Sequence, residues 1–150
     1  MVRKVSVFLL LAVVLVFAGL ADCAEAARGT FADAFSVDVP SGWQVEEEIE
    51  DDIAQFNFTA PDGSARVTII VGENEEGFTA ADVAVGMAES LGGSEPEEDE
   101  DGDFLFTFTS EDGLDGVAFV SVDEETILTF LKIGDHPQMD GFLGSFESVE

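Results

Sequence analysis

Apolar and polar residues alternate with a period of two in six short segments, and this pattern constrains the fold more than any other feature of the sequence. The segments are residues 35–39, 54–59, 65–71, 104–109, 117–122 and 126–133. Because successive side chains of a β-strand point to opposite faces, each segment predicts a strand. Hairpin-length links and turn residues such as Pro61, Asp62 and Gly63 predict mainly antiparallel pairing. In the last two segments both alternating sets are apolar, which predicts a sheet covered on both faces at its centre.

Two other segments have helical periodicity. After Thr79, apolar residues recur at spacings of three and four, namely Ala80, Val83, Ala84, Met87, Ala88 and Leu91. Thr79 and Asp82 have the spacing of a capping box, and Gly92 with Gly93 ends the run. A shorter helix is expected after Pro137, with an apolar side formed by Met139, Phe142, Leu143 and Phe146. The order of elements predicts an α+β fold, a mainly antiparallel sheet of about six strands with helices packed on its faces.

The remaining segments are interpreted as connections. The acidic runs 46–52 and 94–103 are expected to be solvated loops. Trp43 follows a Pro-Ser-Gly turn, where a lone Trp is expected to close the end of a core; stacking on a sugar or on a partner's side chain is the alternative. The 14 Phe residues follow the strand and helix periods, so they are assigned to the core.

The first 26 residues have the features of a secretory signal peptide. Arg3 and Lys4 precede an apolar run over residues 5–20, and Ala24-Glu25-Ala26 forms a small-x-small cleavage site. Cleavage after Ala26 would leave a lead-in over residues 27–34 and a single domain over residues 35–150, in the periplasm or outside the cell. A second interpretation treats Leu20-Ala21-Asp22-Cys23 as a lipoprotein box, with Cys23 lipidated and the protein anchored to a membrane. Asp22 argues against lipidation, because the position before the Cys favours a small uncharged side chain.

The charge of the chain limits its partners. There are 33 acidic and five basic residues, for a formal net charge of −28. After cleavage only Arg28, Arg66 and Lys132 remain as cations, so a nucleic-acid backbone would be repelled. Basic proteins and divalent cations are the partners that such a surface attracts. The same acidity also keeps a protein hydrated in high salt, and the sequence leaves both interpretations open.

Several catalytic arrangements lack their residues. A Ser-His-Asp triad could use only His136, and no Gly-x-Ser-x-Gly segment presents a serine. His136 is therefore expected to be a loop or capping residue. Zinc needs three or four N or S ligands, of which the cleaved chain has one. Nucleotide-binding glycine motifs are also absent from the sequence, so no enzyme activity and no cofactor are expected.

Calcium is the one metal for which the sequence offers ligands. Residues 97–103 concentrate carboxylates, with Asp99, Asp101 and Asp103 as the candidate ligands. The EF-hand pattern does not fit, because a loop that starts at Asp99 places Phe104 where the glycine is needed. The segment therefore predicts weak divalent-cation binding or a hydrated loop.

One motif carries a resemblance to a known family. Phe35-Ser36-Val37-Asp38-Val39-Pro40-Ser41-Gly42-Trp43 resembles the opening motif of the PsbP/DcrB-like family of exported domains. The hairpin at residues 60–65, the helix after Thr79, the double glycine and the final helix are similar in order, over residues 35–146. The resemblance implies an antiparallel sheet between helical layers and a mostly non-catalytic accessory role in the envelope. It implies no family-wide active site.

These observations lead to three functional hypotheses, of which a paired-carboxylate hydrolase is the least favoured because the acids cluster in expected loops. The first is an exported, non-catalytic accessory or binding domain of the bacterial cell envelope that acts through protein–protein contacts, with a basic protein as a suitable partner. The alternative is a divalent-cation or small-ligand binder that uses the acidic loop at residues 95–103.

Overall fold

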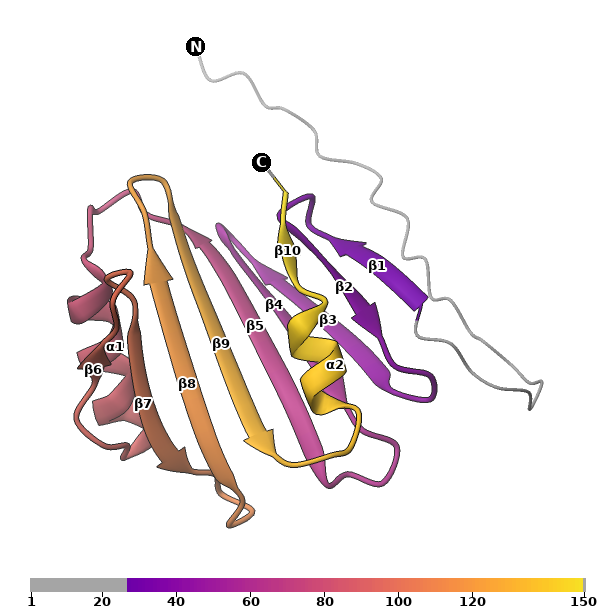
Figure 1. The fold of residues 1–150 in the computed structure, drawn as a ribbon. Coiled ribbons are helices and arrows are strands. Elements are labelled where there is room, and N and C mark those ends of the chain that lie inside the picture. The colour runs from indigo at the N-terminus through magenta and orange to yellow at the C-terminus, as the bar shows by residue number, and fades with distance from the viewer. Residues whose placement is uncertain (1–26, 150) are drawn as a thin grey trace.

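The computed structural model describes residues 27–149, which form two antiparallel sheets and two helices (Figure 1). The larger sheet has seven strands in the order β3-β4-β5-β9-β8-β7-β6. Their bounds are β3 Gln44–Glu50, β4 Ile53–Thr59, β5 Ala65–Glu73, β6 Glu97–Glu98, β7 Phe104–Thr109, β8 Asp115–Val122 and β9 Thr126–Gly134. The smaller sheet has the order β1-β2-β10, with β1 Ala27–Phe31, β2 Phe35–Val39 and β10 Glu147–Ser148. The helices are α1 Ala80–Leu91 and α2 Met139–Gly144.

Each face of the large sheet carries its own hydrophobic core, and the two cores are offset sideways. On one face, here called the α1 face, Ala84 and Ala88 of α1 pack with Phe106 and Phe108 of β7 and with residues of β8 and β9. On the other face, here called the small-sheet face, β2 and α2 pack over β4 and β5 (Figure 1). The α1 layer therefore lies over one half of the sheet and the small sheet over the other half, on the opposite side.

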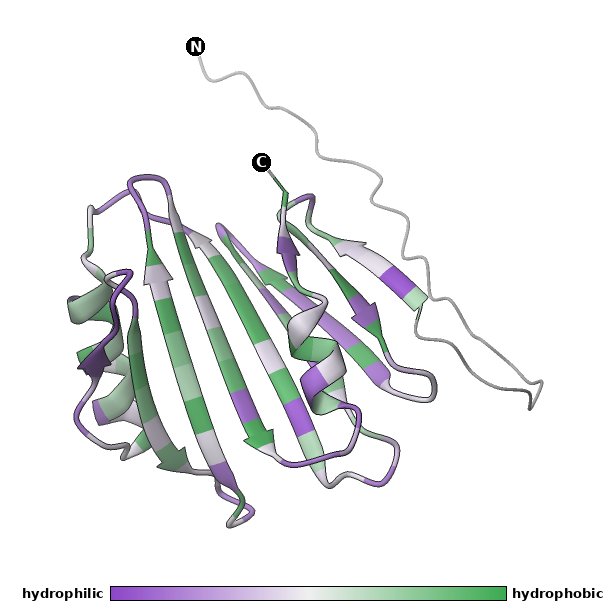
Figure 2. Cartoon of the chain, viewed as in Figure 1, coloured by the Kyte–Doolittle hydropathy of each residue, from purple (hydrophilic) through white to green (hydrophobic). Residues whose placement is uncertain are grey.

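The core under the small sheet is largely aromatic. Phe35, Phe56, Phe58 and Phe142 are fully buried, and Phe31 contacts three of their rings at centroid distances of 5.2 to 5.4 Å. The pairs with Phe56 and Phe58 are edge to face and the pair with Phe35 is stacked, and ring pairs of both kinds add to the stabilisation from burial itself. Figure 2 shows the hydrophobic bands on the central strands β5, β8 and β9 and the hydrophilic colour of β6 and most connecting loops. An apolar interior inside an acidic surface is therefore a property of the fold as well as of the composition.

Helix α1 begins and ends as its sequence predicts. Thr79 is the N-cap, and its side chain and that of Asp82 form the reciprocal hydrogen bonds of a capping box. Gly92 closes the helix with φ 63°, a left-handed conformation that costs glycine little. The predicted α+β fold, the six strands and both helices are confirmed, although α2 begins at Met139, two residues after Pro137.

Four strands were not predicted, and one acidic loop was predicted wrongly. The acidic run 46–52 contributes most of β3, which pairs along its full length with β4. Residues 27–34, expected to be a lead-in, contain β1, which pairs with β2 from Ala27 to Phe31. The run 94–103 contains the two-residue strand β6, and β10 joins β2 near the C-terminus.

Strand β3 is acidic because it forms one edge of the large sheet. Its seven residues are all exposed, and Glu46, Glu47, Glu48 and Glu50 are four of them. An edge strand needs no apolar face to pair with its single neighbour, and its charges discourage pairing with another chain. The acidic composition that suggested a loop is therefore compatible with an edge strand.

Candidate functional site

Trp43 lies in the core and not on a binding surface. It is 7% exposed, and its ring stacks on Phe142 at a centroid distance of 5.6 Å and an interplanar angle of 10°. The indole N–H donates a hydrogen bond to Gln138 Oε1 at 3.1 Å. The prediction that Trp43 closes the end of the core is confirmed.

His136 sits beside Trp43 and acts as a local cap. Its Nδ1 accepts a hydrogen bond from the Gln138 N–H at 3.2 Å, and its ring meets Trp43 edge to face at 5.4 Å. The nearby Asp62 carboxylate accepts hydrogen bonds from the Ser64 hydroxyl at 2.6 Å and from the Ser64 N–H at 3.0 Å. These two bonds, together with the charge of His136, lower the pKa of Asp62. The Ser64 hydroxyl donates its hydrogen bond to Asp62, and within the described residues no hydrogen bond joins it to His136, so the geometry supports the loop or capping interpretation of His136.

The three candidate calcium ligands lie in the turn between β6 and β7. Asp99 Oδ1 accepts hydrogen bonds from the N–H groups of Asp101 and Asp103 at 2.9 and 3.0 Å. The Asp99 carboxylate therefore folds back on its own turn, as Asp side chains do in Asx turns. Within residues 27–149, no three His, Cys, Asp or Glu side chains are grouped so that they could hold a metal ion. Calcium binding stays a prediction, and Cys23, the candidate lipidation site, lies outside the described residues.

Of the three cationic side chains in the described residues, those of Arg28 and Arg66 form ion pairs. Arg28 on β1 donates to Asp38 at 3.1 Å and to Ser36 at 2.8 Å on β2, and it pairs with Glu147 on β10. It thus joins all three strands of the small sheet. Arg66 approaches Asp112 at 3.7 Å. Lys132 forms no ion pair with the residues that the structure describes.

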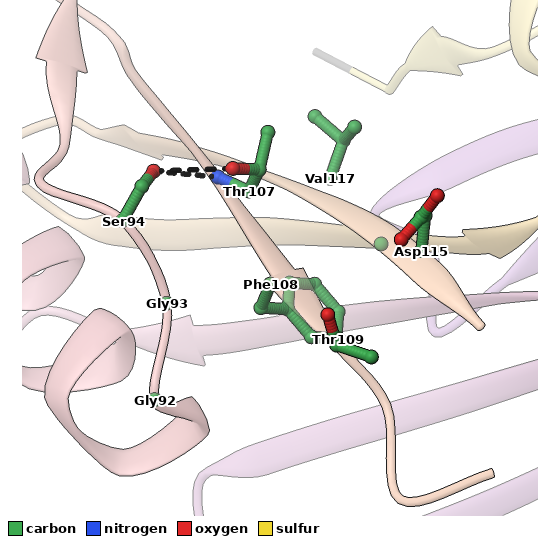
Figure 3. Close-up of a pocket in the computed structure, with 9 residues that line it drawn as sticks. Gly92, Gly93, Ser94, Thr107, Phe108, Thr109, Asp115 and Val117 are labelled. Carbon is green, nitrogen blue, oxygen red and sulfur yellow. Dashed lines mark hydrogen bonds between the residues drawn. The ribbon is translucent and has the colours of Figure 1, made fainter. Parts of the chain in front are cut away.

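One hollow of about 560 Å³ lies at the outer edge of β7 (Figure 3). Ser94 covers this edge: its N–H donates to the Thr107 carbonyl at 2.8 Å, and its Oγ accepts from the Thr107 N–H at 3.0 Å. Thr107 and Val117 face one side of the sheet, whereas Phe108 faces the other. The lining side chains do not converge on a common point in Figure 3, so the hollow has no arrangement that would hold a ligand.

A second hollow, here called the α1 groove, runs between α1 and the strands β5 and β9 and has a volume of about 520 Å³. Its lining is mainly apolar and consists of Ile70, Phe78, Asp82, Val83, Gly86, Met87, Ser90, Leu91, Ile127 and Leu131. The hollow is wide open to solvent, so it is a shallow apolar surface beside α1 and not an enclosed cavity. The groove exists because α1 packs over β7 and β8, so its flank stands beside β5 and β9 without lying on them.

A buried polar residue fixes one end of the α1 groove. Asn74 is 7% exposed; its Nδ2 donates to the carbonyls of Phe78 and Asp123 at 3.0 and 2.9 Å, and its Oδ1 accepts from the Phe78 N–H at 2.8 Å. These bonds fix the backbone of Phe78 at the groove end, and Phe78 is 45% exposed.

Gly86 forms part of the groove wall in the middle of α1. Apart from the adjoining residues and the backbone of α1 itself, no described atom would lie within 4 Å of a Cβ added there, and the residue does not have a positive φ. Glycine in a helix interior costs about 1 kcal/mol relative to alanine. Neither backbone geometry nor crowding requires glycine here, so its effect on the surface is to leave the groove open.

Carboxylates border the sheet beyond the groove. On the α1 face, the strand register aligns Ile70 with Gln55 on β4 and then with Glu48 on β3. Glu46 and Glu50 lie two residues before and after Glu48 on β3, and they share its face because alternate residues of a strand point the same way. Asp82 adds a carboxylate on the α1 side. The groove is therefore an apolar channel with acidic groups on both sides.

Sequence reasoning missed this groove, although some of its signals were present. Gly86 interrupts an otherwise apolar and alanine-rich helical pattern, and Phe78 stands outside every predicted strand and helix. Both features were visible, but their meaning depends on where α1 packs, which the sequence alone does not specify.

Comparison with known proteins gives a structural match and no sequence match. No protein-family model matches the chain, and no curated protein matches it. The solution structure of cyanobacterial PsbP (CyanoP) from Synechocystis sp. PCC 6803 matches with a TM-score of 0.57 and 17% sequence identity, over 87% of this chain and 96% of that chain. None of the described helices is long and apolar enough to cross a membrane. The α+β arrangement of a large antiparallel sheet, a small sheet and two helices is thus a PsbP-like fold.

Proposed function

We propose that this protein is an exported, non-catalytic domain that acts by binding another protein. The observation that carries the proposal is the α1 groove, an apolar channel of about 520 Å³ in a chain with a net charge of −28. An acidic chain favours charged groups at its surface, so a concave apolar surface indicates a contact with a partner. The PsbP-like fold and the signal-like N-terminal sequence support an accessory role in the cell envelope.

The arrangement of polar groups supports binding over catalysis. His136 and Asp62 are engaged in local hydrogen bonds, and the hollow at β7 has no converging side chains. A catalytic acid or base needs burial or a close charged partner that shifts its pKa toward the working pH. For Asp62 the shift goes the other way, since hydrogen bonds from Ser64 stabilise its charged form.

The test is a capture experiment with a matched variant. The purified protein is immobilised and exposed to envelope extract of the producing bacterium at physiological salt, beside Gly86→Leu, which has the same charge. A protein retained by the wild type and lost with Gly86→Leu supports the proposal. Retention of no protein contradicts it, and turnover of any compound in a broad substrate screen contradicts the non-catalytic part.

A further inference from the structure

We infer that the α1 groove accepts an amphipathic, basic helix of a partner protein, lying beside α1 on the α1 face of the sheet. The inference rests on the proposed protein-binding function and specifies the chemistry of the partner. Four features carry it: the apolar floor, the length and width of the open surface, the side-chain-free position at Gly86, and the carboxylates on both sides.

The floor of the groove suits one apolar side of a helix. Ile70, Ile127 and Leu131 form it from two adjacent strands, and Val83 with Met87 forms the wall on α1. The partly exposed Phe78 closes one end. A helix that presents apolar residues at positions i, i+3, i+4 and i+7 would place them against such a floor, as in helix-in-groove recognition.

The dimensions of the groove fit about three helical turns. Its α1 wall extends from Asp82 to Leu91, which is about 14 Å at 1.5 Å per residue. Neighbouring strands are about 4.8 Å apart, so β5, β4 and β3 provide about 10 Å of surface beside the groove. A helix with its side chains is about 10 Å in diameter, so the surface has room for one helix.

Gly86 allows such a helix to approach α1 closely. Small residues at a helix surface let the axis of a second helix come near, and apart from the adjoining residues and the backbone of α1 no described atom lies within 4 Å of a Cβ placed at Gly86. Any larger side chain at this position would occupy the groove. The glycine thus reduces the stability of α1 and leaves room for the partner.

The charges select a basic partner. Glu46, Glu48 and Glu50 are exposed on the α1 face about two strand spacings, or roughly 10 Å, from Ile70. Asp82 lies on the opposite side of the groove. A helix seated on the apolar floor would hold its flanking side chains between these acids, where Lys or Arg gains attraction and Asp or Glu is repelled.

The same charges make other occupants unfavourable. A second copy of this chain would carry the same net charge of −28 and would be repelled. A membrane with anionic headgroups would be repelled by the carboxylates beside the groove. The basic helix is the occupant whose charge complements both borders.

The test uses a synthetic probe of 14 residues, with Leu along one helical side and Lys at the other positions. A second peptide has Glu in place of every Lys. Each peptide is titrated into the purified protein at several NaCl concentrations, with the dissociation constant measured by calorimetry and the contact surface mapped by backbone NMR shifts. Light scattering during the titration reports self-association of the protein, and flotation with phosphatidylcholine vesicles reports membrane binding.

Three variants separate groove binding from general attraction between opposite charges. Gly86→Leu keeps the charge and blocks the groove. The triple variant Glu46→Gln, Glu48→Gln and Glu50→Gln removes the proposed charge partners. A matched triple variant, Glu97→Gln, Glu98→Gln and Glu100→Gln, removes the same charge in and next to the exposed strand β6.

The expected result is binding of the Lys peptide with shifts along α1, β5 and β9 and none detectable with the Glu peptide. Gly86→Leu is expected to weaken binding at least tenfold, and the β3 triple variant about tenfold with a shallower salt dependence, whereas the β6 variant stays within about twofold. Equal binding by wild type and Gly86→Leu, or equal losses in the two triple variants, would overturn the inference. So would self-association or vesicle binding that Gly86→Leu abolishes.

The two proposals fail in different ways. If the envelope extract yields a protein whose capture depends on Gly86 and the Lys peptide does not bind, the basic-helix inference is wrong and the protein-binding function stands. If neither the extract nor the peptide gives Gly86-dependent binding, both are wrong.

Discussion

Replacing Asn74 with Ala is expected to destabilise the fold by about 3 kcal/mol, because one side chain makes three hydrogen bonds at a buried site. These bonds join Asn74 to both backbone groups of Phe78 and to the Asp123 carbonyl, at 2.8 to 3.0 Å. Each contributes about 1 kcal/mol net, and the buried partners left without a bond add a desolvation cost. The substitution also removes one of two links between the loop before α1 and the hairpin that joins β8 to β9, because the Asn74 N–H still donates to the Glu125 carbonyl at 2.8 Å.

The matched control is Gln55→Ala. Gln55 is a half-buried amide whose side chain makes one hydrogen bond to another side chain, to Asn57 Oδ1 at 3.3 Å, so its loss is expected to cost less than about 1 kcal/mol. Urea denaturation followed by far-UV circular dichroism gives the free energy of unfolding of each variant. Hydrogen exchange at the Phe78 amide gives the local effect, with faster exchange expected in Asn74→Ala. Equal unfolding free energies for the two variants, or an unchanged exchange rate at Phe78, would refute this account of Asn74.

Four further perturbations test other parts of the structure. Thr79→Ala should lower the free energy of unfolding by about 1 kcal/mol, measured by thermal denaturation, because it removes the N-cap of α1. It should also raise the pKa of Asp82, which hydrogen bonds from the Thr79 hydroxyl and N–H hold below its usual value of 3.8. Because the pKa of Asp82 is depressed in the folded state, its stabilisation is present above pH 3.8 and is lost as the pH falls below that value. Below pH 3.8 the free energy of unfolding should therefore fall more steeply with pH for the wild type than for Thr79→Ala. Identical pH profiles would contradict the assignment. Gly116→Val should destabilise the protein by about 1–3 kcal/mol, since even a Cβ there would lie 2.5 Å from the Phe108 ring, and a neutral result would mean that this ring can move aside. The melting temperature should rise with NaCl because the net charge of −28 repels itself, so a fall with salt would argue against this effect. Calcium titration should give only weak heats because Asp99 Oδ1 already accepts two backbone N–H groups, whereas a saturable sub-millimolar site would restore the acidic loop as a functional candidate.

The elements that could be predicted are those whose sequence carries its own periodicity. Helix α1 has a cap at Thr79, a stop at Gly92 and an apolar side between them, so its bounds follow from local chemistry. Strands β4, β5, β7, β8 and β9 alternate because at least one of their faces is buried in a core. In these segments local preference and tertiary packing agree.

The elements that were missed take their structure from a neighbour. Strand β3 is exposed along its length, so the buried-versus-exposed alternation used to detect strands is absent, and its pairing with β4 decides its conformation. Strands β6 and β10 have two residues each, too few for any period to be read. Strand β1 depends on hydrogen bonds with β2 and on Arg28, whose three partners are up to 119 positions away in sequence.

The α1 groove was missed for a related reason. Its residues come from β5, α1, β9 and the loop before α1, and no single segment contains the pattern. Asn74 shows the difficulty most clearly, because among the neighbouring Glu73, Glu75 and Glu76 it has the composition of an ordinary polar turn. Two of its three hydrogen bonds are local, to Phe78, and only the packing of the loop against the hairpin after β8 supplies the third, to Asp123.

The small sheet also determines the order in which the chain can fold during its synthesis. Its middle strand β2 is made early, whereas β10 and the α2 residues Met139 and Phe142 are made about 100 residues later. Until those residues emerge, the rings of Phe56 and Phe58 lack part of their covering. A nascent chain would therefore remain prone to aggregation and proteolysis until α2 is available to cover this core.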